Sequence, residues 1–134
     1  MTNTFEDIIA WQKAREFIRH VYQITRSFPD DEKYGLTSQF RRASISIAAN
    51  IAEGYKRIGR DDKLRFLNYS QGSLEECRCY VILCRDIGYI SDQDSTLLIQ
   101  QIEETSKLLN GYSNAINNRK KWEERADSTF VLTP

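Results

Sequence analysis

The sequence has few residues that interrupt helices and no segment that would cross a membrane. Only two prolines, Pro29 and Pro134, occur in 134 residues, so long stretches are free to form helices. No apolar run approaches the roughly 20 residues that a membrane-spanning helix requires. The amino terminus, MTNTFEDIIAW, lacks the basic start and apolar segment of a secretory signal. These absences predict a helical, cytoplasmic protein without a membrane partner.

The chain also lacks an excess of charge of either sign. Lysine plus arginine and aspartate plus glutamate each number 19, and the sequence pI is about 6.6. A strongly basic chain would indicate binding to nucleic acid or to an acidic membrane, and this composition does not. Its length fits one domain with a single core.

Residues that commonly carry catalysis or bind metals are scarce. The single histidine, His20, has no second histidine or glutamate-x-x-histidine pair to complete a metal site, so we interpret it as a solvated or rim residue. The three cysteines are odd in number, which indicates reduced thiols. In a helix, Cys79 points away from Cys77 and Cys84, and we interpret the latter two as buried. We therefore expect no catalytic residue, no metal site and no cofactor, and a protein that is not an enzyme.

Apolar residues recur at intervals of three and four, which predicts an all-α fold of four helices. Connections of a few residues make successive helices antiparallel, so we expect an up-down-up-down antiparallel four-helix bundle over residues 1–118. Residues 119–134 lose the apolar stripe and are expected to form a C-terminal helix extension or a flexible tail. Docking of Phe130, Val131 and Leu132 on a groove is the alternative. The four helices are predicted at about residues 5–28, 36–58, 61–87 and 92–118.

The third predicted helix carries small residues on its buried seam. Asp61 or Asp62 is expected to cap its start, and Gly88 to end it in a left-handed conformation. Glycine inside a helix costs about 1 kcal/mol relative to alanine, so we interpret Gly72 as marking close contact with another helix. Ser91 is expected to cap the fourth helix. The seam is predicted to comprise Phe66, Ser70, Ser73, Cys77, Tyr80, Cys84 and Ile87.

The second predicted helix has small or aliphatic residues on two faces. A surface helix of a monomer would carry charge on its second face, and small side chains there let another backbone approach closely. We therefore predict contact with a different chain. The buried stripe is predicted to comprise Leu36, Phe40, Ala43, Ile47, Ile51 and Ile58. The predicted oligomer-interface residues are Arg41, Arg42, Ile45, Ala49, Asn50, Ala52 and Glu53.

Glu53 lies near the end of this helix, where the helix dipole disfavours a carboxylate. We therefore expect a cation partner, either Arg41 or Arg42 of a neighbouring subunit or, within the chain, Arg57 or Lys56. Plain solvation is the third possibility.

A basic cluster surrounds the predicted turn between the second and third helices, diluted by Asp61 and Asp62. Repeated by the symmetry of an assembly, it would form a phosphate-binding rim. The alternative is an ordinary charged loop, which the zero net charge favours. The candidate nucleic-acid-binding residues are Lys56, Arg57, Arg60, Lys63 and Arg65.

Several motifs point together to a known family. They are GLTSQFRRA from Gly35 to Ala43, ANIAEG from Ala49 to Gly54, Phe66-Leu67, Gly72-Ser73 with Glu75 and Glu76, Leu83, and Gly88-Tyr89. With these motifs the chain resembles, from about Phe5 to Ile116, the bacterial four-helix bundle proteins also called 23S rRNA intervening sequence proteins. The resemblance implies a ring-shaped homopentamer with no enzymatic activity attached to the family.

A more distant resemblance is to the accessory variability protein of diversity-generating retroelements. That resemblance implies a basic pentameric barrel that binds nucleic acid and a reverse transcriptase, and the neutral charge of this chain departs from it. We therefore expect a non-enzymatic, self-associating scaffold or binding module, with another protein or nucleic acid as a further candidate partner. The alternative function is a nucleic-acid-binding accessory protein that acts through the basic cluster.

Overall fold

The computed structural model describes the backbone of residues 4–132 and the side chains of residues 4–118. This part of the chain folds into four α-helices and two short 3₁₀ helices, without a strand, so the predicted all-α class is confirmed. The α-helices are α1 (Ile9–Thr25), α2 (Leu36–Lys56), α3 (Arg60–Ile87) and α4 (Asp92–Leu132), and the 3₁₀ helices are η1 (Phe5–Asp7) and η2 (Asp30–Glu32).

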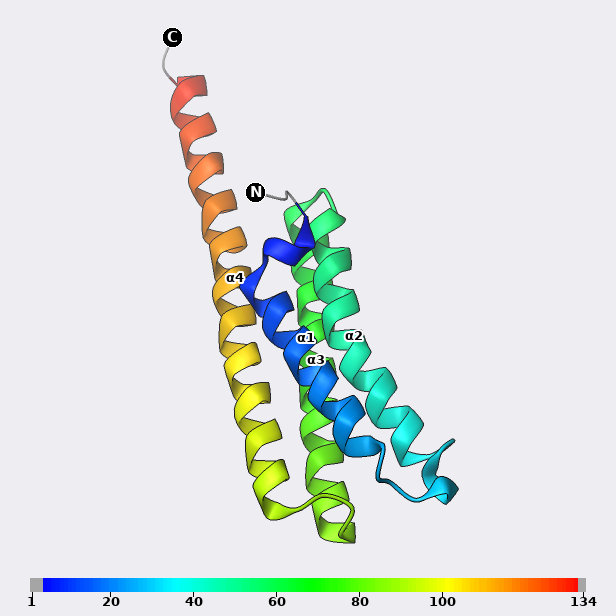
Figure 1. The fold of residues 1–134 in the computed structure, drawn as a ribbon. Coiled ribbons are helices and arrows are strands. Elements are labelled where there is room, and N and C mark those ends of the chain that lie inside the picture. Colours follow the sequence, from blue (N-terminus) through cyan, green and yellow to red (C-terminus); the bar gives the residue numbers. More distant parts are fainter. Residues whose placement is uncertain (1–3, 133–134) are drawn as a thin grey trace.

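The four helices lie side by side around a shared core (Figure 1). Each helix contacts the next one along the chain, and α1 also contacts α4. The α1–α2 connection and the α3–α4 turn lie at one end, whereas η1 and the α2–α3 turn lie at the other. The carboxyl-terminal part of α4 extends beyond the other three helices at this second end.

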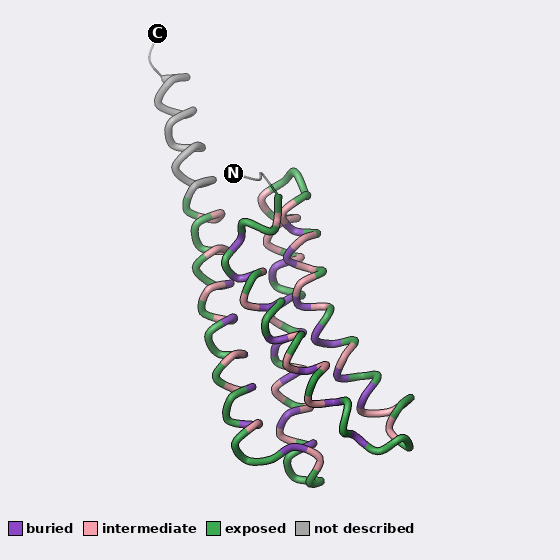
Figure 2. The backbone as a smooth tube through the Cα atoms, in the orientation of Figure 1, coloured by how far each residue is buried: buried purple, intermediate pink, exposed green. Residues whose placement is uncertain are grey.

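Buried residues recur along all four helices, as the purple segments of Figure 2 show. Phe17 of α1, Phe40 and Ile47 of α2 and Leu67 of α3 are among the largest side chains that are fully buried. Burial of such side chains is worth about 1.5–3 kcal/mol each relative to exposure. In α4, Leu98, Ile102, Thr105 and Leu109 recur at intervals of four and three residues and are all buried.

Local signals in the sequence set several helix ends. Gly88 has a φ of 94° and ends α3, and its N–H donates to the carbonyl of Cys84 at 3.1 Å. The N–H of Asp94 donates to Ser91 Oγ at 3.0 Å, which confirms the predicted cap of α4. Asp61 and Asp62 were wrong as caps of α3, because the helix starts at Arg60 and both residues lie in its first turn. Carboxylates there still interact favourably with the helix dipole.

Three predictions of buried or close-packed positions were wrong. Ile58 is 98% exposed because α2 ends at Lys56, so Ile58 leaves the helical register. Ile87 is 54% exposed at the last residue of α3. Gly72 marks no close contact, since an added Cβ would meet nothing within 4 Å. The close approach of α2 and α3 lies instead at Gly54, where a Cβ would lie 3.2 Å from Leu67 Cδ2.

The helix α4 continues past residue 118 to Leu132. The alternative that Phe130, Val131 and Leu132 dock on a groove lies outside the described side chains. None of the helices that the structure describes has the length and apolar character needed to cross a membrane.

Candidate functional site: the outward side of α2

The outward side of α2 carries small and aliphatic side chains that the chain leaves uncovered. Ile45 is 46% exposed, Ala49 is exposed and Ala52 is half-buried. Their spacing of four and three residues places them on one side of the helix. The opposite side, with Ile47 and Ile51, is fully buried. The helix thus carries apolar residues on both sides, and within the described part of the chain only the inner ones are fully covered.

An apolar hollow adjoins this outward side, at the end of the molecule where η1 contacts α2. The ring of Phe5 forms part of its wall and is held in place by an edge-on contact with Trp11 at 5.0 Å between ring centroids. Sequence reasoning missed Phe5 because periodicity within α2 carries no information about a segment far away in the chain. The hollow is lined by Thr4, Phe5, Ala49, Ala52, Glu53, Tyr55 and Lys56.

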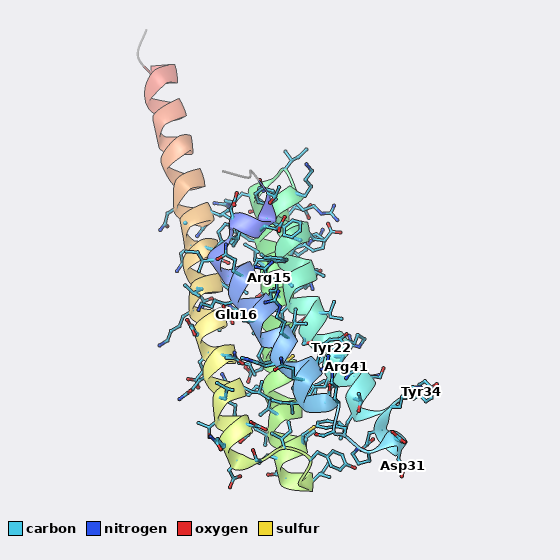
Figure 3. The ribbon with its side chains drawn as sticks, in the orientation of Figure 1. Arg15, Glu16, Tyr22, Asp31, Tyr34 and Arg41 are labelled. Carbon is cyan, nitrogen blue, oxygen red and sulfur yellow. The ribbon has the colours of Figure 1, made fainter. Side chains whose placement is uncertain are left out.

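Two polar residues predicted as subunit contacts are engaged within the chain. Arg41 Nε donates to Thr25 Oγ1 at 2.8 Å, and the guanidinium lies 4.5 Å from the ring centroid of Tyr22. Figure 3 shows Arg41 and Tyr22 side by side between α2 and α1. Asn50 Nδ2 donates to the carbonyl oxygen of Ser46 at 2.9 Å. Arg41 therefore ties α2 to α1, and Asn50 bonds within α2.

The α2–α3 side is joined by a short polar network. Arg42 forms an ion pair with Glu76 at 2.8 Å, and the hydroxyl of Tyr80 donates to the same carboxylate at 3.0 Å. Burial, together with the hydrogen bond to Glu76, raises the pKa of Tyr80. Ser46 Oγ and Ser73 Oγ lie 2.7 Å apart, which is hydrogen-bond distance between the two helices. The charge of Arg42 is thus balanced within one chain, although its side chain is 58% exposed.

Glu53 finds its cation within the chain. Its carboxylate lies 3.5 Å from Arg57 Nη2, one turn further along the helix direction. This confirms the intrachain alternative. The side chain of Glu53 is 56% exposed and stands beside the hollow with Lys56, so both signs of charge are present at its rim.

Most of the basic cluster is also neutralised locally. Arg57 lies 3.8 Å from Asp62 as well as near Glu53, and its guanidinium lies 4.4 Å from the ring centroid of Phe66. Arg65 forms an ion pair with Asp62. These contacts leave little uncompensated positive charge on this side of the turn.

The other members of the cluster differ from one another. Lys63 Nζ donates to the carbonyl oxygen of Tyr55 at 2.7 Å, so Lys63 closes the carboxyl end of α2, and burial lowers its pKa. Arg60 pairs with Asp61 at 3.1 Å and donates to Asn117 of α4 at 3.3 Å. Lys56 is exposed at the rim of the hollow. Four of the five basic residues therefore have acidic, amide or carbonyl partners within the chain.

The predicted placement of the cysteines is confirmed. Cys77 and Cys84 are fully buried and Cys79 is exposed, all three as free thiols. Burial raises the pKa of Cys77 to about 12 and that of Cys84 to about 11, so both stay protonated near neutral pH. His20 Nδ1 lies 2.6 Å from Gln101 Nε2. Within the described residues, no group of three or more histidine, cysteine, aspartate or glutamate side chains is arranged to hold a metal ion.

Comparison with known proteins identifies the family. A family model described as 23S rRNA-intervening sequence protein matches residues 6–111, which is more than half of the chain. The chain belongs to the 23S rRNA-intervening sequence protein family. The matched range contains α1, α2 and α3 entirely, so the outward side of α2 and the basic cluster both lie inside the part shared with other 23S rRNA-intervening sequence proteins.

A solved structure supports the fold. It is described as a protein with unknown function from the S23 ribosomal protein family of Bacteroides thetaiotaomicron. The two share 23% sequence identity with a TM-score of 0.72, over 79% of this chain and 96% of that one. No curated protein matches the chain.

Proposed function

We propose that this protein is a non-enzymatic, self-associating scaffold or binding module whose copies meet through the outward side of α2. The observation that carries the proposal is the exposure of Ile45 and Ala49 beside an apolar hollow, on a helix whose inner side is already fully buried. Removing apolar surface from water contributes about 25 cal/mol per Å², so an uncovered apolar side favours association.

For the assembly we propose an up-down-up-down antiparallel four-helix bundle that forms a ring-shaped homopentamer. Contacts between successive helices and between α1 and α4 support this topology, as do the short connections on either side of α3. The ring size rests on the resemblance to the family. We also propose a cytoplasmic location, because free thiols suit a reducing compartment.

A role without catalysis is supported by the state of the groups that might act as nucleophile or base. The two buried thiols are protonated near neutral pH, and a thiol attacks as the thiolate. Catalysis by a nucleophile needs a neighbouring base and a group that orients that base. In the described contacts, neither His20 nor Cys79 takes part in such a set.

The test is to introduce bulk and charge on the outward side of α2. We expect Ala49→Arg to give a helical monomer, measured as solution mass by light scattering and helix content by circular dichroism. The matched control is Asn68→Arg, which places the same side chain at an exposed position of α3 outside this surface and should keep the wild-type mass. An Ala49→Arg variant with the wild-type mass would refute the assignment of this surface.

The alternative function, nucleic-acid binding through the basic cluster, ranks second because four of its five residues have partners within the chain. Running the same light-scattering experiment with a pool of bacterial RNA separates the two functions. Co-elution at physiological salt would rank nucleic-acid binding first, and neutralising Lys56 and Arg57 should then reduce its salt dependence. If RNA does not change the elution of the protein, the scaffold or binding module remains the first-ranked function.

A further inference from the structure

The ten arginines of residues 4–118 fall into two groups according to their partners. Six of them form ion pairs with carboxylates at nitrogen–oxygen distances of 3.5 Å or less. The other four have no carboxylate within ion-pair distance in this part of the chain, and all of them lie on α1, directly after it, or where α2 contacts it. The paired arginines are Arg42, Arg57, Arg60, Arg65, Arg78 and Arg85, and the unpaired ones are Arg15, Arg19, Arg26 and Arg41.

Three of the unpaired arginines lie on one side of α1. Arg15, Arg19 and Arg26 are all exposed, and separations of four and seven residues place them above one another on a helix. Arg26 follows the last residue of α1 with helical φ and ψ of −60° and −29°, so it keeps the register. The aromatic residues Trp11 and Tyr22 fall on the same side, and we call these five residues the arginine stripe.

Aromatic rings hold two guanidinium groups at this stripe without neutralising them. The guanidinium of Arg15 lies 5.0 Å from the ring centroid of Trp11, and that of Arg41 lies 4.5 Å from the ring centroid of Tyr22. Figure 3 shows Arg15 and Tyr22 on α1, with Arg41 of α2 beside Tyr22. Arg41 Nε also donates to Thr25 Oγ1 at 2.8 Å, a neutral partner that leaves its charge uncompensated. A stacked guanidinium is partly ordered before a ligand arrives, which lowers the entropic cost of binding.

The carboxylate of α1 is engaged elsewhere. Glu16 is the one acidic residue of this helix, and its carboxylate lies 3.7 Å from Lys13. Lys13 also lies 3.4 Å from Glu104, so these charges connect α1 to α4. The arginine stripe therefore keeps a local positive charge, although the whole chain has 19 basic and 19 acidic residues.

We propose that the arginine stripe binds an acidic α-helix of another protein. Carboxylates separated by four and seven residues on one side of a helix repeat at about 6 Å and about 10 Å along its axis. The same separations set the positions of Arg15, Arg19 and Arg26, so one such helix lying along α1 meets all three. The planar guanidinium group binds a carboxylate through two parallel hydrogen bonds, which suits arginine better than lysine to this task. The inference goes beyond the proposed self-association, because the surface and the partner are both different.

Nucleic acid fits these observations less well than a row of carboxylates. Bases bind aromatic side chains by stacking on the face of the ring, and a guanidinium already lies over the rings of Trp11 and Tyr22. Binding of nucleic acid also depends on neutralising many phosphates, whereas the stripe offers three exposed arginines on a chain of zero net charge. Separate carboxylates require only separate, local partners.

The experiment measures binding of a defined helical probe to the whole protein. The probe is an alanine-rich peptide of about 20 residues, long enough to form a helix, with glutamate at three positions separated by four and seven residues. The comparison peptide has glutamine at those three positions. The fluorescence of Trp11 reports binding, in a Trp122→Phe background that leaves Trp11 as the one tryptophan of the chain. We expect the glutamate peptide to bind about tenfold or more tightly than the glutamine peptide.

Variants of the stripe locate the contact. Replacing Arg15, Arg19 and Arg26 together by glutamine should weaken binding of the glutamate peptide about tenfold or more and remove most of its salt dependence. The matched control replaces three paired arginines of α3, so that the same charge is lost elsewhere, and it should keep the wild-type affinity. Circular dichroism and light scattering check that both variants keep the helix content and mass of the wild type. The control substitutions are Arg65→Gln, Arg78→Gln and Arg85→Gln.

Each outcome supports or overturns the inference. Equal affinity for the two peptides, or an equal loss of affinity in the α3 control, overturns it. A single-stranded oligouridylate that binds more tightly than the glutamate peptide, and loses binding in the stripe variant, assigns the surface to nucleic acid and also overturns it. The comparison of the two peptides uses the unaltered stripe, so it tests the inference even where a variant fails to fold. Ala49→Arg, which tests the proposed self-association, should leave peptide binding unchanged, so the two proposals fail independently.

Discussion

Both sides of α2 carry apolar side chains, but the surroundings of the two sides differ. On the inner side, Phe40, Ile47 and Ile51 are fully buried in the shared core. On the outer side, Ile45 is 46% exposed and Ala49 is exposed, although both side chains are apolar. The exposure of these outer residues within the described part of the chain is the basis of the proposed contact between copies.

The neighbouring α2–α3 turn shows the reverse situation. Its basic residues suggested a binding surface, yet Arg57 and Arg65 both lie against Asp62, and Lys63 closes the end of α2. Charged groups with long side chains find partners a few residues away, whereas an aliphatic side chain on an outer helix face has no local means of leaving water. The proposed function therefore rests on the exposed apolar residues of α2 and not on the basic cluster.

Truncation of one isoleucine on each side of α2 gives the largest expected contrast. Ile47→Ala should lower the free energy of unfolding by about 2–5 kcal/mol, because it leaves a cavity in a fully packed core. Ile45→Ala should change it by about 0.5 kcal/mol or less and instead weaken assembly. Urea unfolding of dilute protein and light scattering measure the two effects. Equal losses of stability for the two variants would contradict the distinction between the sides.

Replacing either of two glycines by alanine should change the stability of the fold by less than Ile47→Ala, and with opposite signs. Gly54→Ala should destabilise the fold by about 1–3 kcal/mol, because the new methyl group would lie 3.2 Å from Leu67 Cδ2 and from the Lys63 carbonyl oxygen. Gly72→Ala, in open surroundings on α3, should stabilise it by about 0.5–1 kcal/mol through helix propensity. Thermal unfolding of the two variants checks the opposite signs, and a stabilised Gly54→Ala would disprove the close approach.

A further contrast concerns pH and the inner and outer thiols of α3. Above pH 9 the thiols of the unfolded chain lose their protons, whereas burial keeps the pKa of Cys77 at about 12 and that of Cys84 at about 11. The folded state then binds more protons than the unfolded state, so stability falls as pH rises from 9 to 11. The contribution is at most about 1.4 kcal/mol per pH unit for each thiol.

Urea unfolding at several pH values in this range measures the slope. Replacing Cys77 and Cys84 together by alanine should make the slope shallower, whereas Cys79→Ala, at the exposed position, serves as the control and should leave it unchanged. A wild-type slope in the double variant would show that other groups cause the loss of stability.

Much of the fold follows from local patterns in the sequence. The intervals of three and four residues set the inner stripe of α4, and Gly88 and Ser91 set the boundary between α3 and α4, because backbone conformation and capping depend on nearby residues. The same reasoning failed at Ile58 and Gly72. Because α2 ends at Lys56, two residues before the predicted end, Ile58 lies outside the helical register. A Cβ added at Gly72 would meet nothing within 4 Å, so this glycine marks no close contact.

The features of the candidate site also fall into two groups, those that the sequence determined and those that only the tertiary structure decided. The sequence by itself determined four helices, the buried placement of Cys77 and Cys84, and the apolar character of both sides of α2, since these depend on periodicity within one segment. Only the tertiary structure decided that Arg41 bonds to α1 and that Phe5 walls a hollow beside Ala49. Those features join residues far apart in the chain, and a helical repeat carries no information about which distant segment packs beside it.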